Sequence, residues 1–208
     1  LKDAPEGVET YNSIEEMLEK ADINTVMVST PNPSHPEMVK KAAKAKKNVI
    51  CEKPAAMSVA LFDEMVAACK ENGVLFTVHQ QRRWDKDYRI MKEVYDKNMV
   101  GDMYVIKSQL YGFNGNMHDW HVYPEMGGGM LYDWGIHLID QILMILGWDV
   151  DTVNCRVDHI TNKDVDDGFQ LDLVMKNGQR AYIEVGTYNF IAMPRFYMQG
   201  KGGTAMIT

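Results

Sequence analysis

The sequence lacks the features that mark several large classes of protein. Its three cysteines are widely spaced and form no Cys-x-x-Cys motif, so they cannot all pair, and a reducing, cytoplasmic setting is expected. The longest apolar stretch, around residues 136–146, is interrupted by polar side chains and is far shorter than the ~20 residues that span a bilayer. A net charge of −7 argues against nucleic acid and anionic membranes as partners, because both need a basic surface. A small-molecule ligand fits this composition better.

Strands and helices alternate over the first 80 residues. Ser13 with Glu16, and Ser34 with Glu37, form capping-box patterns that predict two helix starts. Helices are expected at residues 13–21, 34–45 and 58–72, and short strands at residues 25–29, 48–51 and 75–78. Such alternation is typical of right-handed βαβ crossovers and predicts a parallel sheet.

The start of the chain shows two further absences. No Gly-x-Gly-x-x-Gly, the dinucleotide-binding fingerprint, precedes Lys53, and Leu1 opens the chain without an initiator Met, already inside the α/β pattern. We therefore expect an internal piece of a longer protein that lacks about 60 residues of a two-βαβ nucleotide-binding unit.

The pattern changes after residue 80. A helix over 85–98 and a strand over 104–111 precede a loop rich in Gly, Asn and aromatics, and a helix over 130–146 follows it. Period-two alternation then predicts antiparallel strands at residues 169–175 and 181–185, and residues 153–159, 195–199 and 204–207 are expected to add further strands. We expect an antiparallel meander of five or six strands with helices on one face. The fold class is therefore α/β followed by α+β.

Two loops of the parallel part carry polar side chains at the ends of consecutive strands. Residues 30–32 and 52–54 both lie at such carboxyl ends, where doubly wound sheets bind their ligands, so they are expected to line one crevice. The ammonium of Lys53 can hydrogen-bond a substrate hydroxyl that becomes a carbonyl. Pro54 fixes the backbone after it and is a candidate for a cis peptide bond. Taken alone, Lys53 also fits a solvated residue at a strand end.

The helix over 130–146 carries Asp133 and His137 in an otherwise apolar setting. Four positions apart, they share one face of a helix. A carboxylate and an imidazole open to a cleft can act as a general-base pair, in which the Asp orients the ring and stabilises its charged form. The structural alternative is that Asp133 is favoured near the helix start by the helix dipole, and that His137 only forms a hydrogen bond with Asp133.

Three stretches of the sequence together resemble a known enzyme family. STPNPSHPEMVKKAAKAKKNVICEKP, RRWDKDYR and GGGMLYDWGIHLID resemble the glucose-fructose oxidoreductase, inositol dehydrogenase and rhizopine-catabolism (Gfo/Idh/MocA) family of NAD(P)-dependent oxidoreductases. The resemblance covers essentially the whole chain. It implies that residues 1–80 are part of a Rossmann dinucleotide-binding domain without its glycine-rich motif, and that residues 81–208 are an α+β substrate-binding and oligomerisation domain whose C-terminal part is missing.

The family's functional residues map onto matching positions here. The resemblance implies a catalytic group of Lys53, Asp133 and His137, which also contact substrate, together with Arg83. It implies that the cofactor, NAD or NADP, is held by Thr30, Pro31, Asn32, His35, Glu52, Lys53, Pro54 and Gln81. Because apolar faces of sugars stack on aromatic rings, the loop with His118, Trp120, His121 and Tyr123 is expected to cover the substrate through Trp120; an ordinary packed loop is as good a reading.

The implied reaction is hydride transfer between a sugar or cyclitol secondary alcohol and the nicotinamide. Members of this family commonly assemble through the open face of the C-terminal sheet, so the resemblance also implies a homodimer or homotetramer formed through that face. The chain by itself is expected to bind the cofactor weakly or not at all and to be inactive, while the intact protein binds it. Three alternatives stay open: an NAD-assisted glycosidase, a catalytically silent sensor or assembly protein, and a metal-dependent hydrolase built on His118, His121, Glu125 and His137. The substrate, the choice of NAD or NADP and the direction of reaction stay undecided.

Overall fold

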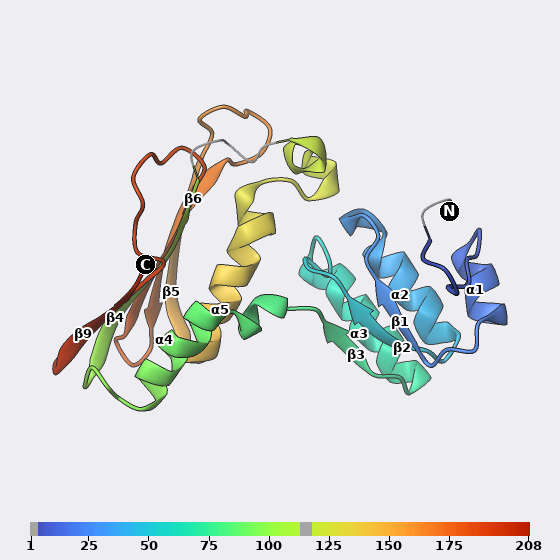
Figure 1. Ribbon diagram of the computed structural model, residues 1–208, viewed down its shortest axis with the longest axis horizontal. Helices are drawn as coiled ribbons and strands as arrows, with labels where there is room; N and C mark the ends of the chain where they lie inside the picture. The colour runs from blue at the N-terminus through green and yellow to red at the C-terminus, as the bar shows by residue number, and fades with distance from the viewer. Residues whose placement is uncertain (1–3, 113–117) are drawn as a thin grey trace. The chain divides into compact units, whose positions relative to one another are not determined.

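The computed structural model describes residues 4–112 and 118–208 (Figure 1). The chain divides into two compact units, Leu1–His79 and Gln80–Thr208, one residue before the boundary expected from the sequence. Throughout the described ranges, no helix is both long and apolar enough to cross a membrane.

Unit 1 is a parallel sheet covered by helices. Its elements are α1 (Ile14–Lys20), β1 (Thr25–Val28), the 3-10 turn η1 (Asn32–Ser34), α2 (His35–Lys44), β2 (Asn48–Cys51), α3 (Val59–Asn72) and β3 (Phe76–Val78). The three strands lie in the order β1-β2-β3, all parallel, as the alternation predicted. Helix α2 packs on β1 and β2, and α3 packs beside α2. The buried core is built from Val26, Val28, Val39, Ala42, Ala43, Val49, Cys51, Ala55, Met65 and Cys69.

Of the two expected capping boxes, the one at Ser13 forms its N-cap, and its Glu16 side chain bonds the residue just before the cap. The Ser13 hydroxyl accepts from the backbone N–H of Glu16, whose carboxylate accepts from the N–H of Asn12, at 3.1 and 3.2 Å. The second prediction is wrong: the Ser34 side chain makes no cap hydrogen bond. Turn η1 runs directly into α2, so Ser34 is already helical, and its hydroxyl oxygen lies 2.7 Å from both Thr30 Oγ1 and the Pro31 carbonyl.

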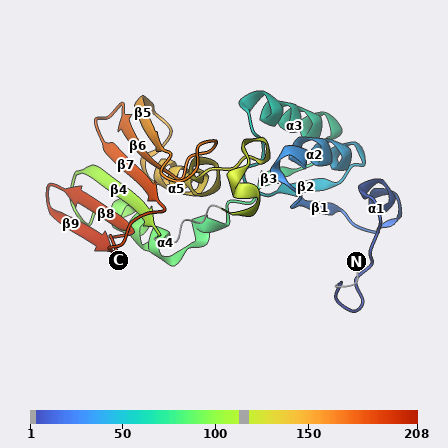
Figure 2. The ribbon, with the colours of Figure 1, turned by 90° about the horizontal axis from the view of Figure 1, so that it is seen from above.

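Unit 2 packs helices on one face of a larger sheet (Figure 2). It consists of the 3-10 turn η2 (Gln81–Trp84), α4 (Lys86–Asp96), β4 (Met103–Tyr111), the 3-10 turns η3 (Asp119–Val122) and η4 (Pro124–Met126), the π-helical turn η5 (Leu131–Gly135), α5 (Ile136–Leu146), β5 (Val150–Asp158), β6 (Gly168–Met175), β7 (Arg180–Gly186), β8 (Phe196–Gly200) and β9 (Gly203–Ile207). The single helix expected over 130–146 is therefore a π-helical turn followed by an α-helix. Such π turns are frequent at functional sites.

The six-stranded sheet is mixed, which corrects the expected meander. Its order is β5-β6-β7-β4-β8-β9, with β4 inserted between β7 and β8. Strand β4 runs parallel to β7 and antiparallel to β8, while the other neighbours are antiparallel. Alternation along a strand reveals which side chains face the core, but it does not reveal which strand lies alongside.

The core of unit 2 lies between the sheet and its helices. Alternate residues of β6 and β7 point towards α5, where Leu138 and Ile142 are fully buried. The sheet side of this core includes Phe169, Leu171, Leu173, Met175, Ala181, Ile183 and Val185. Each buried Leu, Ile or Phe contributes about 1.5–3 kcal/mol, so this layer holds α5, and with it His137, in a fixed place.

Candidate active site

A polar residue directly follows each of the three parallel strands in unit 1: Ser29 after β1, Glu52 after β2 and His79 after β3. Val28 pairs with Cys51, and Cys51 with Val78, so the next residues of each strand meet at one edge of the sheet. There the Nδ1 of His79 lies 2.6 Å from Glu52 Oε1, and the other oxygen of Glu52 accepts from the N–H of Lys53 at 3.3 Å. Glu52 therefore joins the Lys53 loop to the end of β3.

His35 ties the two predicted cofactor loops together. Its ring is fully buried, with Nδ1 3.0 Å from the Pro54 carbonyl oxygen and Nε2 2.8 Å from that of Thr30. The Lys53–Pro54 peptide bond is cis. Thr30 and Pro31 are exposed, Asn32 is almost buried and Lys53 is half-buried. The loops predicted to hold the cofactor are thus neighbours, and the buried ring of His35 joins them.

His137 lies at the start of α5, with 3% of its surface exposed. Its Nδ1 is 3.2 Å from the side-chain oxygen of Gln80, and the Trp134 ring packs against it edge-on at 6.1 Å between centroids. No sequence pattern predicts the Gln80 contact, because 57 positions separate the two residues.

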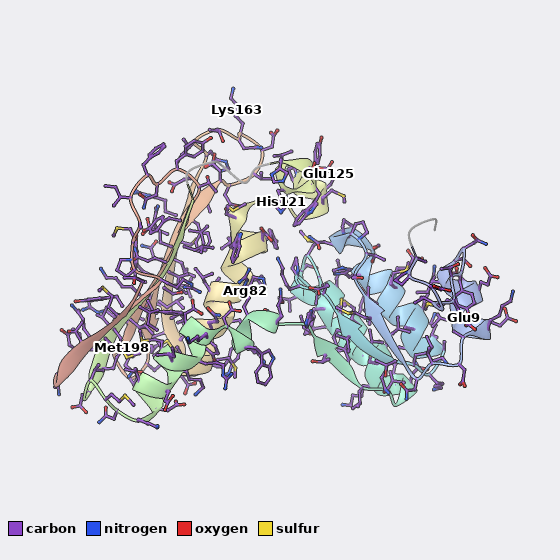
Figure 3. The ribbon with its side chains drawn as sticks, viewed as in Figure 1. Glu9, Arg82, His121, Glu125, Lys163 and Met198 are labelled. Atoms are coloured by element: carbon purple, nitrogen blue, oxygen red, sulfur yellow. The ribbon has the colours of Figure 1, made fainter. Side chains whose placement is uncertain are left out.

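Asp133, in the π-helical turn, meets a residue of the aromatic loop. Its Oδ2 lies 3.5 Å from Nε2 of His121, and both side chains are largely buried. The Nδ1 of His121 lies 3.0 Å from the carbonyl oxygen of His118, and its ring stacks on Trp120 at 3.9 Å between centroids. Figure 3 labels His121 in this loop, which precedes α5 in the chain. The sequence pointed to Trp120 and missed the pairing of His121 with Asp133.

Arg83 and Gln81, predicted to contact substrate and cofactor, lie in η2. The guanidinium of Arg83 makes two hydrogen bonds to Asp140 of α5, at 2.8 and 2.6 Å, and this carboxylate raises the pKa of Arg83. The side-chain oxygen of Gln81 is buried and has no hydrogen-bond partner among the described residues. Arg82 places its guanidinium 4.1 Å from the centre of the Trp134 ring.

Asp166 caps the helix that bears Asp133 and His137. Its side chain accepts a hydrogen bond from the backbone N–H of Leu131 at 2.9 Å, and its backbone carbonyl accepts one from the backbone N–H of Met130 at 3.1 Å. Burial raises the pKa of Asp166. Nothing in the sequence pattern singled out this cap, because it comes from the loop between β5 and β6.

The metal-hydrolase alternative finds no support in this geometry. Across residues 4–112 and 118–208, no group of three or more His, Cys, Asp or Glu side chains is arranged to hold a metal ion. His118 pairs with Asp119, and His121 with Asp133, each at 3.5 Å.

Both units match models of one protein family. Residues 4–80 match a model described as an oxidoreductase family with an NAD-binding Rossmann fold, and residues 88–206 match a GFO/IDH/MocA C-terminal domain. The structure of an NAD-binding protein from Listeria innocua is 39% identical with a TM-score of 0.93, covering 96% of this chain and 57% of that one.

Two further proteins are similar to the chain over most of its length. The myo-inositol 2-dehydrogenase of Thermotoga maritima is 30% identical over 148 residues, which is 71% of this chain and 43% of that enzyme. The WlbA dehydrogenase of Bordetella pertussis, solved with NADH and UDP-GlcNAcA, is 21% identical with a TM-score of 0.82, covering 96% and 60%, and shows the shared fold. The chain thus spans about half the length of these relatives. The predicted family, fold class and nicotinamide cofactor are confirmed, and the chain belongs to the GFO/IDH/MocA family of oxidoreductases.

Proposed function

We propose that the whole protein transfers a hydride between a secondary alcohol of a sugar or cyclitol and a nicotinamide cofactor. The observation that carries this proposal is a nearly buried imidazole, His137, whose Nδ1 lies 3.2 Å from an amide oxygen in a family with an NAD-binding domain. The similarity to a myo-inositol 2-dehydrogenase supports the polyol class of substrate.

The side chains at the carboxyl edge of unit 1 suit a nicotinamide nucleotide. A ribose and a carboxamide need hydroxyl, amide and carboxylate partners, and Thr30, Asn32 and Glu52 supply one of each where doubly wound sheets bind ligands. Pro31, Pro54 and Gln81 are the remaining candidates for contact, with His35 holding the loops. When bound, the nicotinamide ring takes up or gives back the hydride.

The chain's own residues would handle the proton and the substrate oxygen. His137 would accept the proton of the reacting hydroxyl, and Lys53 would donate a hydrogen bond to the same oxygen as it becomes a carbonyl. Asp133 would stabilise the charged imidazole. Arg83 and Trp120 are proposed substrate contacts, Trp120 through stacking on an apolar sugar face.

The test is turnover on a panel of polyols and sugars with NAD and NADP. Lys53→Met and His137→Ala should each lower kcat by ~100-fold or more, the share that positioned acid–base groups supply. Lys70→Met, an exposed lysine of α3, is the matched control and should leave kcat unchanged. Near-normal turnover in either variant would remove that residue from the mechanism.

Two other outcomes would change the reaction class. Release of the aglycone from an aryl glycoside, without net change in NADH, would identify an NAD-assisted glycosidase. Tight cofactor binding without turnover on the whole panel would identify a silent sensor or assembly protein.

We also propose a homodimer or homotetramer formed through the sheet face opposite α4 and α5. On this face the ammonium of Lys107 lies 5.9 and 6.0 Å from the ring centres of Tyr182 and Tyr197, and the Tyr111 hydroxyl donates to Glu184 at 2.5 Å. Tyrosines with polar partners are typical of interfaces. Sedimentation of Tyr182→Asp should show a smaller species than the parent, and an unchanged species would exclude this face. The cytoplasmic location stays a prediction.

A further inference from the structure

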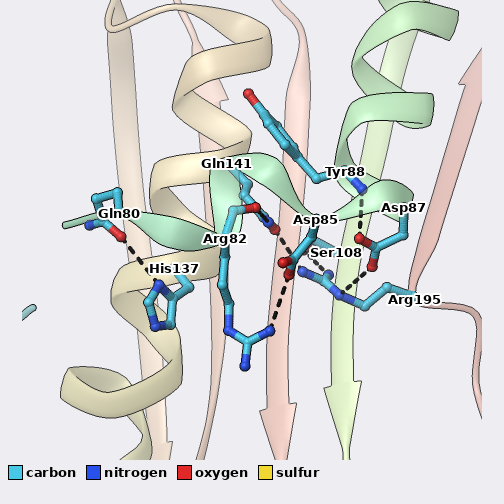
Figure 4. Close-up of polar contacts among 9 residues, drawn as sticks. All are labelled: Gln80, Arg82, Asp85, Asp87, Tyr88, Ser108, His137, Gln141 and Arg195. Carbon is cyan, nitrogen blue, oxygen red and sulfur yellow. Dashed lines mark hydrogen bonds and ion pairs between the residues drawn. The ribbon is translucent and has the colours of Figure 1, made fainter.

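Three side chains on one face of α5 each hold one residue of the segment 80–83. Figure 4 shows two of these contacts, His137 with Gln80 and Gln141 with Arg82. His137 Nδ1 lies 3.2 Å from Gln80 Oε1, the Asp140 carboxylate accepts two bonds from Arg83, and the Gln141 side-chain nitrogen donates to the Arg82 carbonyl at 2.7 Å. Residues 137, 140 and 141 are spaced for a single helix face, so the segment is fixed along it.

Gln141 makes this attachment rigid. It is fully buried, and both ends of its amide are used, because its oxygen accepts from the guanidinium of Arg195 at 2.7 Å. Arg195 in turn donates to the Ser108 hydroxyl of β4 at 2.6 Å (Figure 4). The segment 80–83 is therefore bound to α5 and, through Arg195, to the sheet. Gln80 has little freedom to move away from His137.

We propose that Gln80 is a positioning residue that selects the protonation tautomer of His137. An amide oxygen can only accept, so the Nδ1 of His137 must carry the proton in their hydrogen bond. A neutral imidazole protonated on Nδ1 has its lone pair on Nε2, and which nitrogen is protonated is set by the bond the other ring atom makes. Only 3% of His137 is exposed, so little solvent reaches the ring to compete with Gln80.

The tautomer decides which nitrogen can act as base. With the proton on Nδ1, Nε2 is the atom that takes the substrate's proton, and the amide fixes the ring plane as well. This catalytic consequence rests on the proposed function, whereas the tautomer itself is a property of the folded protein and can be measured without substrate.

The test is NMR of the histidine ring nitrogens in ¹⁵N-labelled protein, at a pH where His137 is neutral, with the His137 signals identified by their loss in His137→Gln. The parent should show a protonated Nδ1 and an unprotonated Nε2. Gln80→Met, which keeps the size but removes the acceptor, should shift the ring towards the Nε2-protonated form that the neutral histidine side chain prefers in water. Gln80→Glu keeps an acceptor and should retain the parent tautomer. Gln179→Met, in the turn between β6 and β7, is the matched control.

Kinetics of the same variants separate the two proposals. Gln80→Met should lower kcat about 10- to 100-fold, part of what a general base supplies, with little change in KM, and Gln80→Glu should recover part of the loss. A parent ring protonated on Nε2, or an unchanged tautomer in Gln80→Met, overturns the role of Gln80. A shifted tautomer with unchanged kcat supports that role but removes His137 as the base of the proposed reaction.

Discussion

His121 Nε2 and Asp133 Oδ2 lie 3.5 Å apart, which joins the aromatic loop to the π-helical turn just ahead of His137. The side chains are 19% and 14% exposed, so their attraction is screened less than that of a surface pair. The stacking of Trp120 on His121 extends the contact to the residue proposed to touch substrate. The aromatic loop and Asp133 are therefore joined within unit 2.

The pair predicts a loss of turnover when the imidazole at position 121 is removed. His121→Phe keeps a ring for Trp120 to stack on but leaves Asp133 without this partner. We expect kcat to fall about tenfold, as for a group that supports acid–base chemistry without transferring the proton itself. Steady-state kinetics measure it, with Trp120→Leu as the comparison, where KM should rise more than kcat falls. Unchanged kcat in His121→Phe would reduce the pair to packing.

The ion pair between Arg83 and Asp140 should be asymmetric in its effect on stability. The Asp140 side chain is 10% exposed and that of Arg83 41%. Arg83→Met leaves an almost buried carboxylate unpaired and should cost about 3 kcal/mol, whereas Asp140→Asn leaves a half-hydrated guanidinium and should cost about 1 kcal/mol. Urea unfolding measures both. If Asp140→Asn lowers the free energy of unfolding more than Arg83→Met does, the burial of the Asp140 carboxylate does not determine the energies of the two variants.

The same two variants test whether Arg83 binds substrate. Asp140→Asn retains the guanidinium, so KM should change little, and Arg83→Met should raise KM several-fold. Equal effects on KM would mean that Arg83 acts by holding η2 in place.

Asp167 should give the folded protein a stability that depends on acid pH. Burial works to raise the pKa of this fully buried side chain, but hydrogen bonds from the backbone N–H groups of Ile160, Thr161 and Asn162 outweigh it, and the pKa lies below its ordinary value. The contribution is therefore complete above the unfolded pKa of about 3.9 and is lost as the pH falls through the lower folded value.

Asp167→Asn removes this charge and replaces one of the two acceptor oxygens by an NH₂ group, which cannot accept a hydrogen bond. At neutral pH the variant should be less stable than the parent by about 1–3 kcal/mol, and the difference should shrink as the pH falls below about 4. Urea midpoints at several pH values measure it, with Asp164→Asn, exposed in the same loop, as the control. A difference that does not change with pH would mean that the carboxylate charge is not involved.

The sequence was sufficient for the local structure because local signals define it. The strands of unit 1 and their parallel pairing followed from short β-branched runs between helices, and β6 and β7 followed from strict alternation. Ser13 formed its cap, whereas Ser34 did not, because the turn before α2 was already helical. Residues in the loop over 113–117 lie outside the described part of the chain.

Pairings between distant segments were beyond the sequence. The insertion of β4 beside β7, the cap from Asp166, and the partners of Asp133 and His137 all join residues that no periodicity relates. Motif resemblance identified Lys53, Asp133 and His137 as candidates, but a motif does not name the neighbours that orient them. Those neighbours, Gln80 and His121, emerge only from the packing of α5.

A side chain at Gly129, just before the helix that carries Asp133, should destabilise the fold. Its φ is +98°, and a Cβ there would collide with Oδ1 of Asp166, whose other oxygen caps Leu131. Gly178 has a similar φ of +87°, but a Cβ there meets nothing within 4 Å. Gly178→Ala should therefore lower the free energy of unfolding by the backbone strain alone, about 1–2 kcal/mol. Gly129→Ala should lower it by the same strain and by about 1–3 kcal/mol more, because it also displaces the Asp166 cap.

Activity should separate the two alanine variants more sharply than stability. Displacing Asp166 moves the first turn of the helix, and with it Asp133, so Gly129→Ala should lower kcat at temperatures where the variant is still folded. Gly178→Ala lies in the turn between β6 and β7 and should keep the parent's kcat. Unfolding midpoints and steady-state kinetics on the same preparations measure both effects. Equal destabilisation of the two variants would show that the loop holding Asp166 moves aside at no cost in stability. The cap would then have no part in placing Asp133 and His137.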